Sequence, residues 1–124
     1  IETLVAHLSV AKVDAIVIEV ADGLLQCETA ALLDSRVFAK TVDSIIFAAG
    51  DAMGAAAGVE CLQRKNLPIA AVSGRLTASP LAIIETGKIT GMPVLDKAAL
   101  SSQTIAEVLQ ISPQMSGMRN AAAR

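Results

Sequence analysis

The strongest constraint on the fold is an alternation of short apolar runs with stretches of helical periodicity. Apolar runs occupy residues 15–21, 44–49, 69–73 and 92–95, and helical spacing of apolar residues covers about 1–12, 25–33, 52–65, 79–90 and 101–110. Strands that alternate with helices favour a parallel sheet with right-handed crossovers and helices on both faces. The sequence therefore predicts an α/β protein with three α/β/α layers and a mainly parallel sheet of about four strands.

The first apolar run carries two carboxylates near its end. Residues 15–21 are largely β-branched, which is typical of a strand buried on both faces, and Glu19 lies inside the run, with Asp22 just after it. Ligands of open α/β sheets bind beyond the carboxyl ends of the strands. Two interpretations stay open, because these acids could serve a ligand or metal there, or could be a solvated strand-end acid and a turn cap.

The loop after the second run is rich in small residues. Gly50, Gly54 and Gly58 are four residues apart, and Asp51 follows the first of them. Such a loop could bring the backbone close to a phosphate at a helix N-terminus, or could let a helix pack tightly on the sheet. The spacing is not that of the dinucleotide fingerprint G-x-G-x-x-G.

A polar loop follows the third run and contains Ser73 and Arg75. An arginine in this place could clamp a phosphate or carboxylate, or could be a solvated loop side chain. The pair Ser79-Pro80 predicts a helix start and Gly91 its end. Because Glu19, Asp22, Asp51 and Arg75 each end or follow a predicted parallel strand, we expect them to cluster at one edge of the sheet.

Composition excludes several classes of function. Aromatic residues make up 2% of the chain and the net charge is −2, which argues against nucleic-acid binding. No apolar run has the length of a membrane span, and neither a signal peptide nor a lipidation motif is visible. The two cysteines, Cys27 and Cys61, are far apart and without clustered histidines, which favours a reducing, cytoplasmic location.

The expected domain covers residues 1–111, and residues 112–124 are expected to form a loose tail. The sequence opens inside a helical stretch without an N-cap, so we expect the domain to be a piece of a larger nucleotide-binding domain. Ile18, Ile46 and Val72, one from each of the first three runs, are expected to be among the least exposed residues.

Residues 14–95 resemble the part downstream of the phosphate loop in dethiobiotin synthetase-like P-loop NTPases, the superfamily of the MinD-type ATPases and cobyrinic acid synthases. The chain has E-V-A-D-G at residues 19–23, where that family typically has E-G-x-G-G. Over residues 45–69 a strand is followed by a small-residue loop, a helix with V-E-C-L and then N-L-P-I, where the family commonly has a Gly-[IL]-Pro-[IV] step into the next strand. The third match is T-G-M-P-V-L at residues 90–95, similar to the family's T-G-L-P-V-L.

The resemblance implies a P-loop or Rossmann-like fold and a role for several residues. Glu19, with Asp22, would hold Mg²⁺ near the phosphates of ATP. The loop 50–54 would line the substrate or dimer side, and the loop 73–80 would lie where the family reads the base. The chain departs from the family at Val20 and Asp22, which replace glycines, and it contains no G-x-x-x-x-G-K-[ST] phosphate loop.

Two functions are therefore expected from different classes. In the first, the chain is part of a nucleotide-binding domain that uses Mg²⁺ and ATP to activate a small acid or to run an ATPase switch. As it stands it is not a complete NTPase, and no catalytic residue is assigned. In the second, the same fold is a non-catalytic regulatory or dimerisation module. The expected partners are a nucleotide or small acidic metabolite, with a homodimer left open. A receiver-like domain is a weaker third interpretation, because the acidic pair and phosphoacceptor of receivers are missing.

Overall fold

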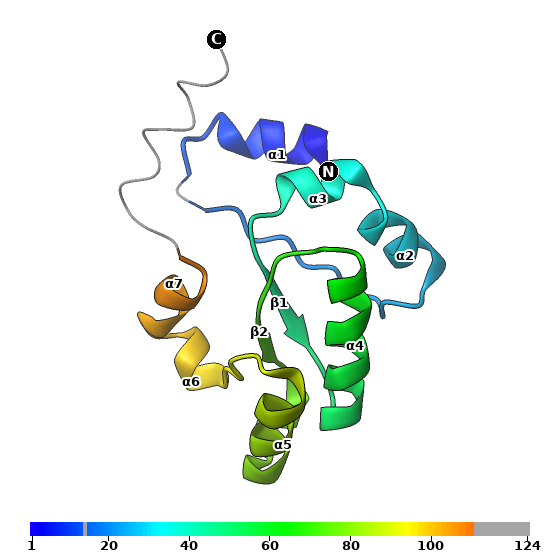
Figure 1. Ribbon diagram of the computed structural model, residues 1–124. Coiled ribbons are helices and arrows are strands. Elements are labelled where there is room, and N and C mark those ends of the chain that lie inside the picture. The colour runs from blue at the N-terminus through cyan, green and yellow to red at the C-terminus, as the bar shows by residue number, and fades with distance from the viewer. Residues whose placement is uncertain (14, 111–124) are drawn as a thin grey trace. The chain divides into compact units, whose positions relative to one another are not determined.

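A computed structural model describes residues 1–13 and 15–110 of the chain (Figure 1). The expected tail, residues 112–124, lies outside these described residues. By their internal contacts the residues form two compact units. The N-terminal unit comprises residues 1–41 together with Gln110, and the C-terminal unit comprises residues 42–109. Within the described residues, no helix is both long and apolar enough to span a membrane.

The described part of the N-terminal unit is built from three helices, α1 (Glu2–Ser9), α2 (Cys27–Leu33) and α3 (Arg36–Thr41). The side chain of Gln26 caps α2 by accepting hydrogen bonds from the backbone amides of Glu28 and Thr29, at 3.0 and 3.4 Å. Thr29 and Leu33 from α2 and Phe38 from α3 are the buried residues of this unit. Its core is therefore small.

The prediction of a strand over residues 15–21 is wrong. These residues have no regular secondary structure, and Val17 is 94% exposed. Ile18 is 42% exposed, so its prediction as a core residue is also wrong. A β-branched run forms a buried strand only where another strand pairs with it and a further layer covers its side chains. The described part of the N-terminal unit contains helices and no strand.

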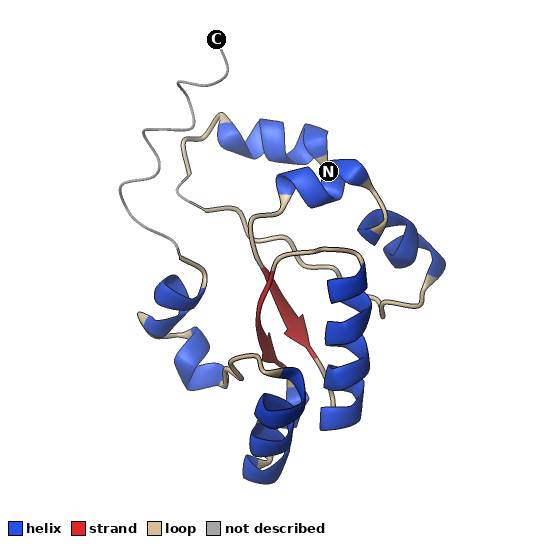
Figure 2. Cartoon of the chain, viewed as in Figure 1, coloured by secondary structure: helices blue, strands red, loops and turns tan. Residues whose placement is uncertain are grey.

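The C-terminal unit contains the sheet, which consists of β1 (Ile45–Ala48) and β2 (Ile69–Ser73) joined through α4 (Ala52–Arg64). The two strands are parallel, with Phe47 opposite Val72 and Ala48 opposite Ser73 (Figure 2). A third segment pairs with β2 through a parallel bridge between Val72 and Val94. The parallel arrangement is therefore confirmed for these three segments.

The expected four-strand sheet is not seen among the described residues, and a three-layer arrangement is not confirmed. The run 92–95 makes only the single bridge at Val94, where the amide of Val72 donates to Pro93 O and the amide of Leu95 donates to Val72 O, both at 2.9 Å. The segment lies between Gly91, which ends the preceding helix, and Asp96, which caps the next one.

The remaining elements are η1 (Arg75–Ala78), α5 (Pro80–Thr90), α6 (Lys97–Leu100) and α7 (Thr104–Val108). The predicted limits of α5 are confirmed: Ser79 Oγ accepts from the amide of Ala82 at 3.3 Å, and Gly91 adopts the left-handed conformation. The last helix expected over 101–110 is confirmed with narrower limits as α7, and Ser102 Oγ accepts from the amide of Thr104 at 3.2 Å. The short helix α6, which begins at the Asp96 cap, was not expected.

The core of the C-terminal unit lies between α4, β2 and η1. It includes Ala55, Val59, Val72 and Leu76, with half-buried side chains such as Phe47 packed against them. Val72 is fully buried, as predicted, whereas Ile46 is only half-buried. The reason is that β1 pairs only with β2 among the described residues, so it is an edge strand, whose side chains are more accessible than those of a central strand.

Candidate functional site

The loops that follow β1 and β2 meet at the carboxyl edge of the sheet. The amide of Ala49 donates to Ser73 O at 2.9 Å, and the amide of Leu76 donates back to Ala49 O at 3.1 Å. Between these bonds Gly74 has a φ of +101°, and a Cβ on it would lie 2.6 Å from Ala49 N. A side chain does not fit there, so glycine is what allows the second loop to cross so close to the first.

Arg75 lies beside the first of these loops. A Cβ placed on Gly50 would be 3.6 Å from Arg75 Nη2, so the guanidinium passes over a backbone that carries no side chain. Both residues are exposed, and Arg75 has no hydrogen bond or ion pair within the described residues. A guanidinium with free donors can hold a carboxylate or phosphate through two parallel hydrogen bonds.

Asp51 follows Gly50 and caps α4. Its Oδ1 accepts a hydrogen bond from the amide of Gly54 at 2.7 Å. The start of α4 therefore already has a carboxylate on one of its free amides, and the helix dipole favours that negative charge. A phosphate could use this helix end only by displacing Asp51, so the arginine is the better anion-binding group of this edge.

Two other residues proposed from the sequence have structural partners. The hydroxyl of Ser73, which is buried, donates to Leu95 O at 2.6 Å and ties β2 to the segment beyond α5. A Cβ at Gly58 would lie 2.1 Å from Phe47 Cε1, so this glycine lets α4 pack directly on β1. Of the two interpretations of the glycine-rich loop, tight packing therefore applies to Gly58.

Glu19 and Asp22 belong to the N-terminal unit. Both are exposed and lie in the segment without regular secondary structure. No group of three or more histidine, cysteine, aspartate or glutamate side chains gathers around a potential metal position in the part of the chain that the structure describes. The grouping of these two acids with Asp51 and Arg75 stays a prediction.

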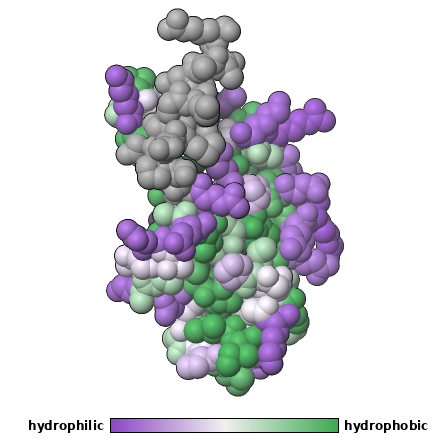
Figure 3. Space-filling view, turned by 60° about the vertical axis from the view of Figure 1, so that its left-hand side comes forward, coloured by the Kyte–Doolittle hydropathy of each residue, from purple (hydrophilic) through white to green (hydrophobic). Residues whose placement is uncertain are grey.

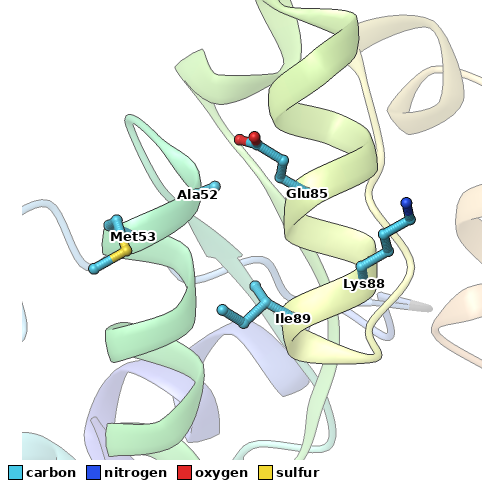
Figure 4. Close-up of a pocket in the computed structure, with 5 residues that line it drawn as sticks. All are labelled: Ala52, Met53, Glu85, Lys88 and Ile89. Atoms are coloured by element: carbon cyan, nitrogen blue, oxygen red, sulfur yellow. The ribbon is translucent and has the colours of Figure 1, made fainter.

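One further feature of the structure was not predicted from the sequence. A surface pocket of about 550 Å³ lies between the first turn of α4 and the second half of α5, and its lining consists of Ala52, Met53, Glu85, Lys88 and Ile89 (Figure 4). The sequence signal for it is that α5 has apolar residues around its whole circumference, more than one buried face can use.

Comparison with known proteins gives no assignment: no family model, no curated protein and no solved structure matches the chain.

Proposed function

We propose that the chain is part of a nucleotide-binding α/β domain, in which the carboxyl edge of the C-terminal unit contacts an anionic ligand. The observation that carries this proposal is the position of Arg75, exposed and without a partner among the described residues, beside Gly50. The parallel β1–α4–β2 unit supports it, because such units collect their ligands where the strands end. The ligand class is a nucleotide or a small acidic metabolite.

Arg75 would contribute binding and orientation. Its two outer nitrogens would donate to two oxygens of one phosphate or carboxylate group, and such charge-assisted pairs are stronger than neutral hydrogen bonds. Gly50 would leave room for the ligand, since a larger residue there would approach the guanidinium. Ser73 would act indirectly, by holding β2 against Leu95 and so fixing the loop on which Arg75 lies.

Mg²⁺ and ATP enter this proposal through Glu19 and Asp22. The donor set fits the ion, because Mg²⁺ usually takes one or two carboxylates and completes its shell with waters and phosphate oxygens. Both side chains are exposed and therefore accessible to such a complex. When bound, the ion would neutralise phosphate charge. The overall reaction would be ATP-dependent activation of a small acid, or an ATPase switch.

The test of the anion site is saturation-transfer difference NMR, which detects weak ligands, with ATP added to the 124-residue chain. We expect weak binding, because no phosphate loop supplies the amides that cradle phosphates. The signal should fall several-fold in Arg75→Ala and stay unchanged in Arg64→Ala. Arg64 is a suitable control because it is also an exposed arginine, at the end of α4, and pairs with Glu60. Equal signals from both variants would reject the site.

A second test addresses the metal. Glu19→Gln should remove any dependence of ATP binding on Mg²⁺ while leaving the melting temperature nearly unchanged, because the side chain is exposed. Binding that responds neither to Mg²⁺ nor to this substitution would remove Glu19 from the proposal.

The alternative, a non-catalytic regulatory or dimerisation module, is favoured by a different observation. Four large apolar side chains are more than half exposed on the first turn of α4 and along α5, namely Met53, Leu81, Ile84 and Ile89. Hydrophobic surface gathers at the end of the C-terminal unit where α5 lies (Figure 3). Contiguous exposed apolar surface commonly marks a protein–protein contact.

A further inference from the structure

One face of α5 is exposed among the described residues, and part of it borders the pocket shared with the first turn of α4. Residues 81, 84, 85, 88 and 89 share one side of the helix, and Thr86, on the opposite side, is fully buried. Leu81, Ile84 and Ile89 are 63, 54 and 62% exposed. A face with three large apolar side chains out of five is unusual for a helix that meets only water.

The two charged residues of this face give it a self-complementary pattern. Glu85 and Lys88 are exposed, carry opposite charges and stand one turn apart, flanked by Ile84 and Ile89. In an antiparallel pair of identical helices related by a two-fold axis, position 85 can face position 88 of the second copy while position 84 faces position 89. This register makes two Glu–Lys pairs and two Ile–Ile contacts at once, as expected of an isologous interface.

The pocket beside α5 offers a place for an apolar side chain of the second copy. Ile89 points toward the first turn of α4, where Met53 lies, and Glu85 and Lys88 line the same pocket (Figure 4). In the antiparallel register described above, Ile84 of the second copy would lie at the mouth of this pocket. This side chain would enter the pocket between Met53 and Ile89, and the flanking charges would meet their opposites at its rim.

We propose that α5 is a homodimerisation surface, on which the α5 helices of two copies pack antiparallel with Glu85 of each copy facing Lys88 of the other. This inference rests on the second function proposed above and is independent of Arg75. The contact is one three-turn helix from each chain, so the dimer should be weak and in concentration-dependent exchange with monomer.

The test is sedimentation equilibrium of the 124-residue chain over a concentration series up to the millimolar range, at low salt. The wild-type chain should dimerise reversibly. Glu85→Lys alone and Lys88→Glu alone should each weaken the dimer at least tenfold, because each variant places like charges opposite one another twice. The double variant, Glu85→Lys with Lys88→Glu, should restore the wild-type dissociation constant.

Mixing the two single variants gives the sharpest result. An equimolar mixture should form heterodimers although neither variant dimerises alone, since every facing pair then has opposite charges. Glu60→Lys, a charge reversal on the exposed side of α4, is the control and should leave the dimer intact. Circular dichroism should show all variants folded, because every substitution is at an exposed position.

Three results would overturn the inference: a wild-type chain that stays monomeric, single variants that dimerise as the wild type does, or a mixture without heterodimers. None of these substitutions touches the loop around Arg75. A wild-type chain that binds ATP but stays monomeric would therefore reject the surface and leave the nucleotide site standing, and a wild-type chain that dimerises but does not bind ATP would reject the nucleotide site alone.

Discussion

The ring of Phe47 on β1 lies directly against the backbone of Gly58 on α4. A Cβ at Gly58 would be 2.1 Å from Cε1 and 2.2 Å from Cζ of this ring, which no real contact allows. Gly58 therefore lets α4 pack directly against this ring. A larger residue at this position would have to move the ring or the helix.

Gly58→Ala should destabilise the C-terminal unit. Overpacking of this kind costs about 1–3 kcal/mol, which outweighs the gain of up to about 1 kcal/mol that alanine brings to a helix interior. Gly87→Ala in α5 is the matched control, because a Cβ there meets nothing within 4 Å. It should stabilise by about 0.5–1 kcal/mol. Urea unfolding followed by circular dichroism measures both, and equal effects of the two substitutions would contradict the packing account.

Gly74→Ala should cost more than Gly91→Ala. Both glycines have positive φ, at +101° and +67°, but only Gly74 is crowded, with Ala49 N and O each 2.6 Å from the position of its missing Cβ. For Gly91 we expect the left-handed penalty alone, about 1–2 kcal/mol. For Gly74 the clash adds to it, and we expect a total loss of at least about 3 kcal/mol. Similar melting temperatures for the two variants would show that the two loops are not held together at Ala49.

Thr86→Val should stabilise the protein. Thr86 is fully buried and its Oγ1 has no hydrogen-bond partner within the described residues, whereas a methyl group of the same size needs none. Removing an unsatisfied buried hydroxyl should gain about 1 kcal/mol. Thr90→Val is the control, because Thr90 Oγ1 donates to Thr86 O at 2.7 Å and accepts from the amide of Met92 at 3.2 Å. It should destabilise, and the opposite order of the two variants would mean that Thr86 has a partner.

Leu62→Ala and Ile18→Ala should differ strongly in their effect on the free energy of unfolding. Leu62 is 1% exposed in α4 and should cost about 2–5 kcal/mol when truncated. Ile18 is 42% exposed, so its truncation should cost less than about 1 kcal/mol. Chemical denaturation of both variants checks this, and a large loss at Ile18 would restore the original prediction of a core residue there.

The parts of the fold that local chemistry decides could be predicted from the sequence. Ser79-Pro80 and Gly91 delimit α5 as expected. Residues 69–73 form the predicted strand within its predicted limits. At the start of α5 the deciding interaction lies within a few residues of the signal, because the Ser79 hydroxyl accepts from the amide of Ala82. The strand 69–73 forms because its distant partner β1 is present beside it.

The run 15–21 could not be placed, because a strand depends on what lies beside it. Its composition is that of a buried strand, yet Val17 is almost fully exposed and the run has no ladder. The spacing of apolar residues indicates the local secondary structure of a segment, but not which other segments lie beside it. The same reason explains Ile46, whose burial would need a further strand next to β1.

The candidate site could be predicted only in its topology. That Asp51 and Arg75 follow two adjacent parallel strands was foreseeable from the alternation of elements. The roles of the individual atoms were not, because they depend on contacts across the chain: Ser73 Oγ meets Leu95 O, 22 residues away, and Arg75 meets the backbone of Gly50. The pocket beside Met53 could not be foreseen, because its lining comes from two helices, α4 and α5, whose placement side by side no local pattern gives.

The most direct test of the central proposal is to map which amides of the chain respond to ATP, by ¹⁵N–¹H correlation spectra recorded during a titration. We predict the largest shift changes at Gly50, Asp51, Gly74 and Arg75, saturating together and absent in Arg75→Ala. Shift changes confined to residues outside these two loops, or unaltered by Arg75→Ala, would contradict an anion site at the carboxyl edge of β1 and β2.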